Sequence, residues 1–379
     1  MARRVVLAYS GGLDTSVAVR WMQEEWGVEV VALAVDVGQF PGEIVQGGHG
    51  DFEAIRQRAL AAGAVEAHVV DAKQEFADDF CAPALAANAL YEAKYPLVSA
   101  LSRPVIAKHL ARVARETGAD AVAHGCTGKG NDQVRFEVSS RVLAPELDVL
   151  APVREWGFTR EDSIEYAAKH GIPITAKKDK LYSIDENLWG RTVECGILED
   201  PWVQPPGDIW ERSLPPAGGV PEPREIVIGF QAGVPTSLDG KALALHQLVP
   251  ALDVAVGAYG FGRIDMVENR RVGIKSREIY ECPGSLALIL AHADLESITV
   301  ERDVLREKAR MEPRYAELVY DGLWYSPLKE AFDAFMARTQ EFVTGEVRLR
   351  LESGRCYVVG RRAEVGLYCL LYTSDAADE

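Results

Sequence analysis

A strand-to-helix turn near the start of this 379-residue chain constrains its fold more than any other feature. Residues 3–9 form an almost continuous apolar run, which is typical of a strand buried on both faces of a parallel sheet. After residue 16 the apolar residues recur with helical spacing, and Gly27 marks the expected end of that helix. Residues 10–16 are therefore predicted to connect a buried strand to a helix.

This turn has the composition of a phosphate-binding loop. Gly11 and Gly12 let a ligand approach the backbone with no Cβ in the way. The hydroxyls of Ser10, Thr15 and Ser16 surround the free N–H groups of the first helical turn, which favour an anion. The spacing fits neither a Walker A loop nor a dinucleotide fingerprint. A glycine-rich turn without a ligand is the alternative that these residues alone leave open.

Composition and charge limit the classes of function. The 48% hydrophobic and 26% charged fractions are typical of a soluble globular protein, and the length suggests two domains. No apolar run is long enough for a membrane span, and no room is left for a signal peptide, so we expect a cytoplasmic protein. A formal net charge of -16 argues against general nucleic-acid binding. The six cysteines show no zinc or C-x-x-C spacing, so reduced thiols are expected.

Residues 1–172 alternate between expected strands and helices, which indicates an α/β domain with a parallel sheet. Further strands are expected over residues 28–35, 64–70, 119–124 and 148–153. Further helices are expected over residues 51–63, within 71–91, from Pro104 to Gly118, and over 159–170. Residues 173–366 have the texture of an α+β domain, with a hairpin turn at Asp239-Gly240 and a helix around residues 243–248.

A second segment suited to ligand binding follows the fourth expected strand. Residues 125–137 contain three glycines within six residues, interleaved with polar and charged side chains. Because ligands of open α/β sheets bind beyond the carboxyl ends of the strands, this segment, Val35 and the 10–16 turn should lie close together. A flexible loop without a ligand is again the alternative reading of this segment taken alone.

Four motifs together resemble the argininosuccinate synthase family of the N-type ATP pyrophosphatases, or PP-loop enzymes. They read AYSGGLDTS at 8–16, HGCTGKGNDQVRFE at 124–137, SIDEN at 183–187 and GRIDMVENR at 262–270. The resemblance extends from about residue 3 to about residue 367. It implies a parallel-sheet PP-loop domain over residues 1–172 and a synthetase domain for substrate binding and oligomerisation over 173–366. It also implies a homotetrameric, AMP-forming carbon–nitrogen ligase that joins L-citrulline to L-aspartate in arginine biosynthesis.

The implied chemistry is consistent with these segments. The ureido group of citrulline has no leaving group, so its oxygen must first attack the α-phosphorus of ATP. The aspartate amine then displaces AMP from the citrullyl-adenylate. Phosphoryl chemistry of this kind depends on positioning and charge stabilisation, so a catalytic Ser-His-Asp or Cys-His set is not required.

The resemblance also implies the site residues. ATP is expected at Ala8, Tyr9, Ser10, Gly11, Gly12, Leu13, Asp14, Thr15, Ser16, Val35 and Gly125. Aspartate is expected at Thr127, Asn131 and Asp132. Citrulline is expected at Tyr95, Asn131, Arg135, Ser183, Thr192, Glu268 and Tyr280. Mg²⁺ is expected on the pyrophosphate oxygens, with no metal ligand from protein side chains. Taken singly, the tyrosines would more often be packing residues and Glu268 a surface carboxylate.

The chain departs from the family pattern at several points. A citrulline-side serine is absent from residues 95–100, and Ser99 is expected to replace it. Thr192 stands where a serine is common, and Val35 where a smaller residue is usual. Residues 40–50 resemble an insertion beside the ATP site. Residues 367–379 do not resemble the C-terminal helix of the family, so we expect a truncated or artefactual tail and weaker tetramer assembly.

Three alternatives fit the sequence less well. A tRNA thiolase would require paired catalytic cysteines and a basic RNA-binding face. GMP synthetase or asparagine synthetase would require an ammonia source, usually a glutaminase domain with an N-terminal cysteine. A module that senses ATP without turnover would leave the second domain unexplained.

Overall fold

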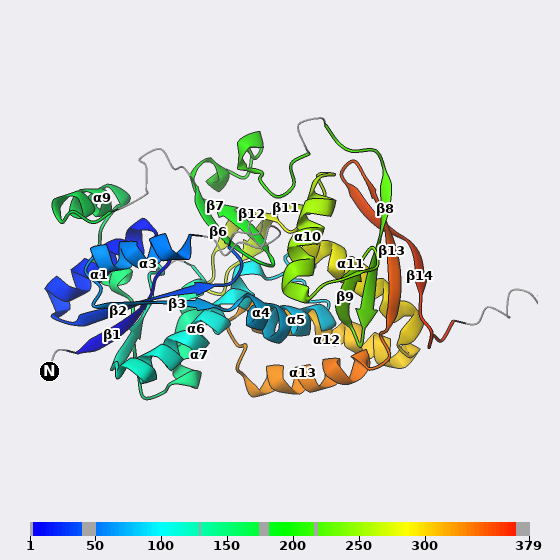
Figure 1. Ribbon diagram of the computed structural model, residues 1–379, viewed down its shortest axis with the longest axis horizontal. Coiled ribbons are helices and arrows are strands. Elements are labelled where there is room, and N and C mark those ends of the chain that lie inside the picture. The colour runs from blue at the N-terminus through cyan, green and yellow to red at the C-terminus, as the bar shows by residue number, and fades with distance from the viewer. Residues whose placement is uncertain (1–2, 40–50, 129, 174–181, 216–218, 369–379) are drawn as a thin grey trace, which may run out of the picture.

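The computed structural model describes residues 3–39, 51–128, 130–173, 182–215 and 219–368. A parallel sheet flanked by helices lies at one end of the molecule, and a long antiparallel sheet lies at the other (Figure 1). A smaller antiparallel sheet lies between them (Figure 1). The predicted combination of an α/β part and an α+β part is confirmed.

The parallel sheet has the strand order β3-β2-β1-β4-β5. Its strands are β1 (Arg4–Ala8), β2 (Glu29–Asp36), β3 (Glu66–Asp71), β4 (Ala121–Ala123) and β5 (Asp148–Leu150). The helical segments of this half are α1 (Leu13–Trp26), α3 (Phe52–Ala61), α4 (Lys73–Phe76), the π-helical turn η1 (Ala77–Cys81), α5 (Ala82–Ala86), α6 (Val98–Thr117), α7 (Asp132–Leu143), α8 (Pro152–Glu155) and α9 (Arg160–Lys169).

Alternate residues of β1 face opposite sides of this sheet, as the pleat of a strand requires. Val5 and Leu7 belong to the apolar cluster that includes residues of α1 and α3. Val6 belongs to the cluster that includes residues of α6. Helices therefore cover both faces of the sheet, which explains why the strand reads as a continuous apolar run.

Several helix ends form as the sequence predicts. Gly27 ends α1 in the left-handed conformation, with φ of 64°. Asp51 caps α3 by accepting a hydrogen bond from the backbone N–H of Ala54 (3.0 Å). Thr159 and Asp162 form a reciprocal capping box at the start of α9.

Three predicted boundaries are wrong, and prolines explain all three. Helix α6 begins at Val98, not at Pro104, because a proline early in a helix removes only one backbone hydrogen bond. Strand β5 ends at Leu150, since Pro152 begins α8 at a position where a missing N–H is harmless. The helix expected around residues 243–248 is α10, which continues past Pro250.

Two antiparallel sheets organise the second half, in the orders β10-β9-β8-β13-β14 and β11-β12-β7-β6. Their strands are β6 (Ser183–Asn187), β7 (Gly190–Glu194), β8 (Arg224–Gln231), β9 (Val234–Leu238), β10 (Lys241–Ala242), β11 (Arg263–Asn269), β12 (Lys275–Glu281), β13 (Gly345–Glu352) and β14 (Arg355–Arg362). The helices are η2 (Gly196–Glu199), η3 (Gly207–Ile209), α10 (Leu245–Gly257), α11 (Pro283–Thr299), α12 (Arg302–Tyr320) and α13 (Pro327–Gln340).

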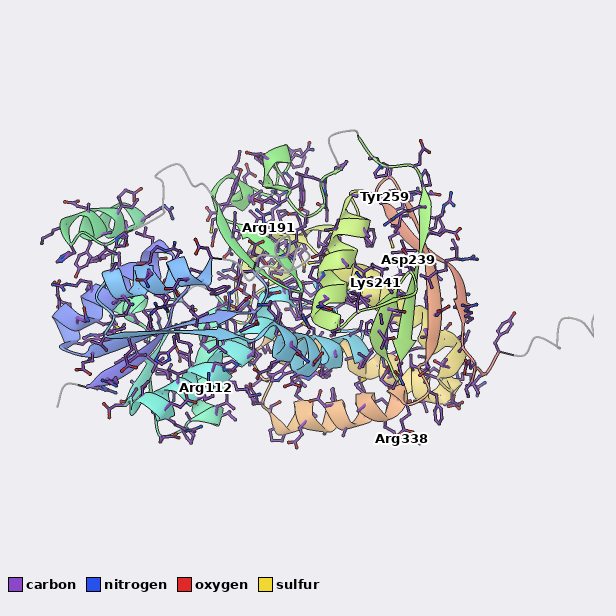
Figure 2. All side chains as sticks on the ribbon, viewed as in Figure 1. Arg112, Arg191, Asp239, Lys241, Tyr259 and Arg338 are labelled. Carbon is purple, nitrogen blue, oxygen red and sulfur yellow. The ribbon has the colours of Figure 1, made fainter. Side chains whose placement is uncertain are left out.

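The predicted turn at Asp239-Gly240 joins β9 to β10. Both residues have positive φ, 50° and 77°, as a type I′ hairpin turn requires. Asp239 and Lys241, on either side of Gly240, are labelled in Figure 2.

The topology places the two predicted ligand-binding loops side by side. β1 pairs with β2 on one side and with β4 on the other, so the loops after β1 and β4 leave adjacent strands at the same edge of the sheet. The β6–β7 hairpin reaches this edge, where the backbone N–H of Leu188 donates to the carbonyl of Val37 (2.8 Å). A site built at this edge can therefore use residues from both halves of the chain.

Candidate active site

A cavity of about 570 Å³ opens at this edge of the parallel sheet. Sixteen of the residues expected to bind substrates line it: Ala8, Tyr9, Ser10, Asp14, Thr15, Val35, Gly125, Thr127, Asn131, Asp132, Tyr95, Arg135, Ser183, Thr192, Glu268 and Tyr280. The structure thus brings together segments that lie up to 272 residues apart (from Ala8 to Tyr280).

The loop after β1 leaves backbone N–H groups free at the start of α1. Gly12 is the N-cap residue and provides no side-chain cap for that helix. Ser10 Oγ accepts from the N–H of Gly12 (3.3 Å) and lies 3.1 Å from Thr15 Oγ1. Unsatisfied N–H groups at a helix N-terminus form a site for phosphate or another anion.

Four residues of the predicted loop, Gly11, Gly12, Leu13 and Ser16, are not among those that line the cavity. Leu13 is buried with the apolar residues between the sheet and α1. Ser16 is fully buried, and its hydroxyl lies 2.8 Å from the hydroxyl of Tyr9. Ser16 and the Tyr9 side chain therefore hold the loop in place from behind.

The loops after β1 and β4 touch. A Cβ added to Gly125 would lie 2.9 Å from Cγ2 of Thr15, so a larger residue would push the loops apart. His124, the neighbouring residue, lines the cavity, and its Nδ1 accepts from the N–H of Cys126 (3.3 Å). Burial lowers the pKa of His124 to about 4, so this imidazole is neutral and carries its proton on Nε2.

Two arginines converge on Asp132 in the wall of the cavity. Arg103 donates to Asp132 Oδ2 through Nε (2.9 Å) and Nη2 (2.7 Å), and Arg135 donates to Oδ1 (2.8 Å). Arg103 also pairs with Asp185 on β6. Burial opposes ionisation of Asp132, but the charges of Arg103 and Arg135 outweigh it and hold its pKa below the usual range.

Aromatic side chains form another part of the wall. The rings of Tyr95 and Tyr280 stack with centroids 4.2 Å apart, and the Tyr280 hydroxyl donates to Glu268 (3.1 Å). The Arg135 guanidinium lies 4.9 Å from the ring centroid of Tyr320. Asn131 donates to the Tyr320 hydroxyl (2.8 Å). Tyr320 therefore contacts both Arg135 and Asn131, two of the residues predicted to bind substrates.

Hydroxyl groups from three segments complete this wall. Thr192 Oγ1 is buried and has no hydrogen-bond partner within the described part of the chain. Ser183 is exposed at the start of β6. Ser99, the expected replacement for a missing serine, lines the cavity and donates to Asp185 (2.6 Å).

Two carboxyl groups meet Arg270 where β7 and β12 adjoin the cavity. Arg270 donates to Glu194 (2.6 Å) and to Glu278. Burial, followed by the charges of Glu194 and Glu268, raises the pKa of Glu278 to about 9. Glu278 is therefore protonated at neutral pH.

Several cavity residues escaped the sequence interpretation: Arg103, His124, Asp185, Glu194, Arg270, Glu278 and Tyr320. Each is an ordinary residue type outside any pattern with a known chemical meaning, or lies within a matched motif without an assigned role. Asp185 and Arg270 fall inside the motifs at 183–187 and 262–270, so their motif membership was an available signal.

No group of three or more His, Cys, Asp or Glu side chains suited to a metal ion occurs among the residues with described positions. Asp14, in the first turn of α1, lines the cavity. Burial raises the pKa of Asp14, and the charge of Arg160 opposes that rise. None of the helices in the described ranges is both long and apolar enough to span a membrane.

Two family models match the chain. Residues 4–173 match the N-terminal HUP domain of arginosuccinate synthase, and residues 182–378 match the C-terminal domain. The second match includes residues 367–378, all but the last residue of the tail that was expected to depart from the family, and residues 369–379 lie outside the described residues.

Similar proteins extend over nearly the whole chain. The argininosuccinate synthase of Symbiobacterium thermophilum is 55% identical over 378 residues, which cover 100% of this chain and 92% of the relative. That of Halalkalibacterium halodurans is 53% identical over 366 residues, with 97% and 87% covered. Among solved structures, the U34-tRNA thiolase NcsA from Methanococcus maripaludis matches 46% of this chain and 58% of its own at 18% identity. The TM-score of that match is 0.30.

Proposed function

The chain belongs to the argininosuccinate synthase family, and on that premise we propose how the cavity is divided among the substrates. The enzyme ligates L-citrulline and L-aspartate in arginine biosynthesis and uses ATP. One observation supports the division: segments matched to all three substrates meet in a single cavity of about 570 Å³.

ATP binds at the end of the cavity formed by the loops after β1 and β4. The free N–H groups at the start of α1 bind the phosphates, together with the hydroxyls of Ser10 and Thr15. Val35 and Gly125 contact the nucleotide through backbone and apolar surface. Mg²⁺ bound to the phosphate oxygens would neutralise negative charge on the departing pyrophosphate.

Citrulline binds against the wall formed by Tyr95, Tyr280 and Thr192. Arg135 is buried and positively charged, so it suits the citrulline α-carboxylate. Glu268 lies beside the Tyr280 hydroxyl and suits the α-ammonium group. Ser183 and Asn131 supply further hydrogen bonds to the same amino acid.

Aspartate binds where the loop after β4 meets α7. Thr127 is exposed there and offers a hydroxyl, while Asn131 retains one amide hydrogen beyond the one it donates to Tyr320. Asp132 is ionised and suits the aspartate ammonium group. Its two arginine partners add positive charge for the substrate carboxylates.

The reaction follows from this division. The citrulline ureido oxygen attacks the α-phosphorus, pyrophosphate leaves, and a citrullyl-adenylate forms. The aspartate amine then attacks the activated carbon and AMP leaves. The chain contributes by aligning the groups and by opposing charge that develops on the phosphoryl oxygens.

Thr192→Val tests the citrulline assignment with little disturbance of the fold. Because Thr192 Oγ1 has no partner among the described residues, the substitution should not lower the melting temperature. It should lower kcat/KM for citrulline by about tenfold, as expected for one lost hydrogen bond. Thr127→Val is the matched control and should instead raise KM for aspartate. An effect of Thr192→Val on aspartate alone would contradict the assignment.

The assembly and location of the enzyme follow the family pattern. We expect a homotetramer in the cytoplasm, with assembly weakened if the final residues differ from the family helix. Size-exclusion chromatography with light scattering measures the oligomeric mass directly. A stable tetramer at low micromolar concentration would contradict the weakened assembly, and a monomer would contradict the tetramer itself.

A further inference from the structure

Arg58 on α3 is a cation without a partner among the residues that the structure describes. Its side chain makes no hydrogen bond or ion pair with any described residue, and its Nε is buried without an acceptor. Arg56, two residues earlier, is paired with Glu53 through Nε (2.8 Å) and Nη2 (2.7 Å). A guanidinium is always charged at physiological pH, and a buried donor without an acceptor is unfavourable. Arg58 thus has hydrogen-bonding capacity that no described residue uses.

Helix geometry directs Arg58 toward the loop after β1. Residues three apart share a face of a helix, so Phe52, Ile55 and Arg58 form one stripe along α3. Phe52 and Ile55 line the cavity. One turn further on, Arg58 reaches Gly11: a Cβ built on Gly11 would lie 3.0 Å from Arg58 Nη2. The unpaired guanidinium therefore lies against the loop whose N–H groups are free.

Only glycine is suited to this contact. Gly11 has φ of 74°, and an added Cβ would also lie 3.4 Å from the Ile55 side chain. The close approach of Arg58 to the loop backbone depends on that missing side chain. The free N–H groups of the loop and the Arg58 guanidinium that lies against it form an anion site with two independent sources of attraction.

We propose that Arg58 binds the β- and γ-phosphoryl oxygens of ATP and holds them as pyrophosphate leaves. This assignment rests on the proposed ATP site. For reaction, the α-phosphorus must face the citrulline wall, so the β and γ groups are those left against the loop and Arg58. A bidentate guanidinium suits two adjacent phosphoryl oxygens and leaves AMP uncontacted.

Calorimetric titration of pyrophosphate, ATP and AMP into the full-length protein tests the proposal. The variants are Arg58→Gln, Arg58→Lys and, as the matched control on the same helix, Arg56→Gln. Arg58→Gln should weaken pyrophosphate and ATP binding by about tenfold to a hundredfold, as expected for lost charge-assisted hydrogen bonds, with AMP binding unchanged. Arg58→Lys should recover part of the affinity, and Arg56→Gln should match the wild type.

Unchanged AMP binding also shows that Arg58→Gln is folded at the site. If Arg58→Gln binds all three ligands as Arg56→Gln does, Arg58 is a solvated cation and the proposal is wrong. Equal loss of AMP and pyrophosphate binding would overturn the specific role at the β and γ groups. If the wild-type protein binds neither ATP nor pyrophosphate, the proposed nucleotide site fails, and the role of Arg58 fails with it.

Discussion

At the scale of single residues, Asp132 holds two arginines from different helices in the cavity wall. It bonds Arg103 of α6 and Arg135 of α7, and both guanidinium groups are largely buried. Removing the carboxylate charge would leave Arg103 with Asp185 alone and would take from Arg135 its ion-pair partner. Asp132 is therefore expected to matter for stability as well as for aspartate binding.

Asp132→Asn should destabilise the protein by about 3 kcal/mol at neutral pH, as expected when one partner of a buried ion pair is removed. The pKa of Asp132 is lower in the folded protein than in the unfolded chain. Its stabilising contribution is therefore present above the unfolded pKa and is lost as pH falls through the folded pKa. Chemical unfolding at several pH values measures the difference, which should shrink only under strongly acidic conditions. A variant as stable as the wild type at neutral pH would contradict this role.

Glu278 has the opposite pH dependence. Its pKa rises from an ordinary value of 4.5 to about 9, chiefly because it is buried. A carboxyl that binds its proton more tightly when folded favours folding at low pH, and this contribution is lost as pH rises through that interval. Glu278→Gln replaces the neutral carboxyl group with a neutral amide of the same shape. The melting temperature of the variant should therefore vary less with pH than that of the wild type. The rise in melting temperature over the wild type should be largest at alkaline pH. A fall in melting temperature that is equal at all pH values would contradict a protonated Glu278.

Most of the candidate site could be predicted at this scale, because its residues occur in dense motifs with a known meaning. Arg103 and Tyr320 could not be, and for Asp185 the only signal was its place in the 183–187 motif. Asp185 has its partner Arg103 82 residues away, and Tyr320 has Arg135 185 residues away. Their roles depend on contacts that only the folded chain creates.

At the scale of elements, the periodicity and capping residues of the sequence predicted which helices and strands form. They predicted less well where those elements begin and end. Strands β1 and β2 and helices α1, α3 and α9 form close to their expected ends, where glycines or capping residues mark them. Prolines made the predicted boundaries of α6, β5 and α10 wrong, because tertiary packing outweighs one missing hydrogen bond. The β6–β7 hairpin was not predicted from the sequence. Its strands pair within the second half of the chain and carry polar residues that line the cavity.

Two glycines at strand ends allow backbone strain to be separated from packing. Gly240 has φ of 77° and open space around a built Cβ, whereas Gly262 has φ of 95° and its Cβ would lie 2.5 Å from the Pro283 backbone. Gly240→Ala should therefore cost about 1 kcal/mol, from strain alone. Gly262→Ala should cost about 3 kcal/mol or more, because α11 would have to move. Urea unfolding measures both, and equal costs would show that α11 shifts freely.

At the scale of the whole molecule, the cavity depends on both halves of the chain. The N-terminal half provides the loops after β1 and β4, and the C-terminal half provides β6, β7, β11, β12 and the end of α12. The net charge of -16 does not prevent binding of an anionic nucleotide, since Arg58, Arg103 and Arg135 are concentrated around the cavity. The two halves are needed together because the C-terminal half supplies Ser183, Thr192, Glu268 and Tyr280, four of the seven residues proposed for citrulline.

The central claim is that one cavity activates citrulline with ATP and then transfers it to aspartate. AMP and pyrophosphate release from ATP should be measured with citrulline present, with and without aspartate. We predict pyrophosphate release that requires citrulline, and argininosuccinate with free AMP only when aspartate is added. A folded protein that binds ATP but releases no pyrophosphate with citrulline, or that releases it equally without citrulline, would contradict the account.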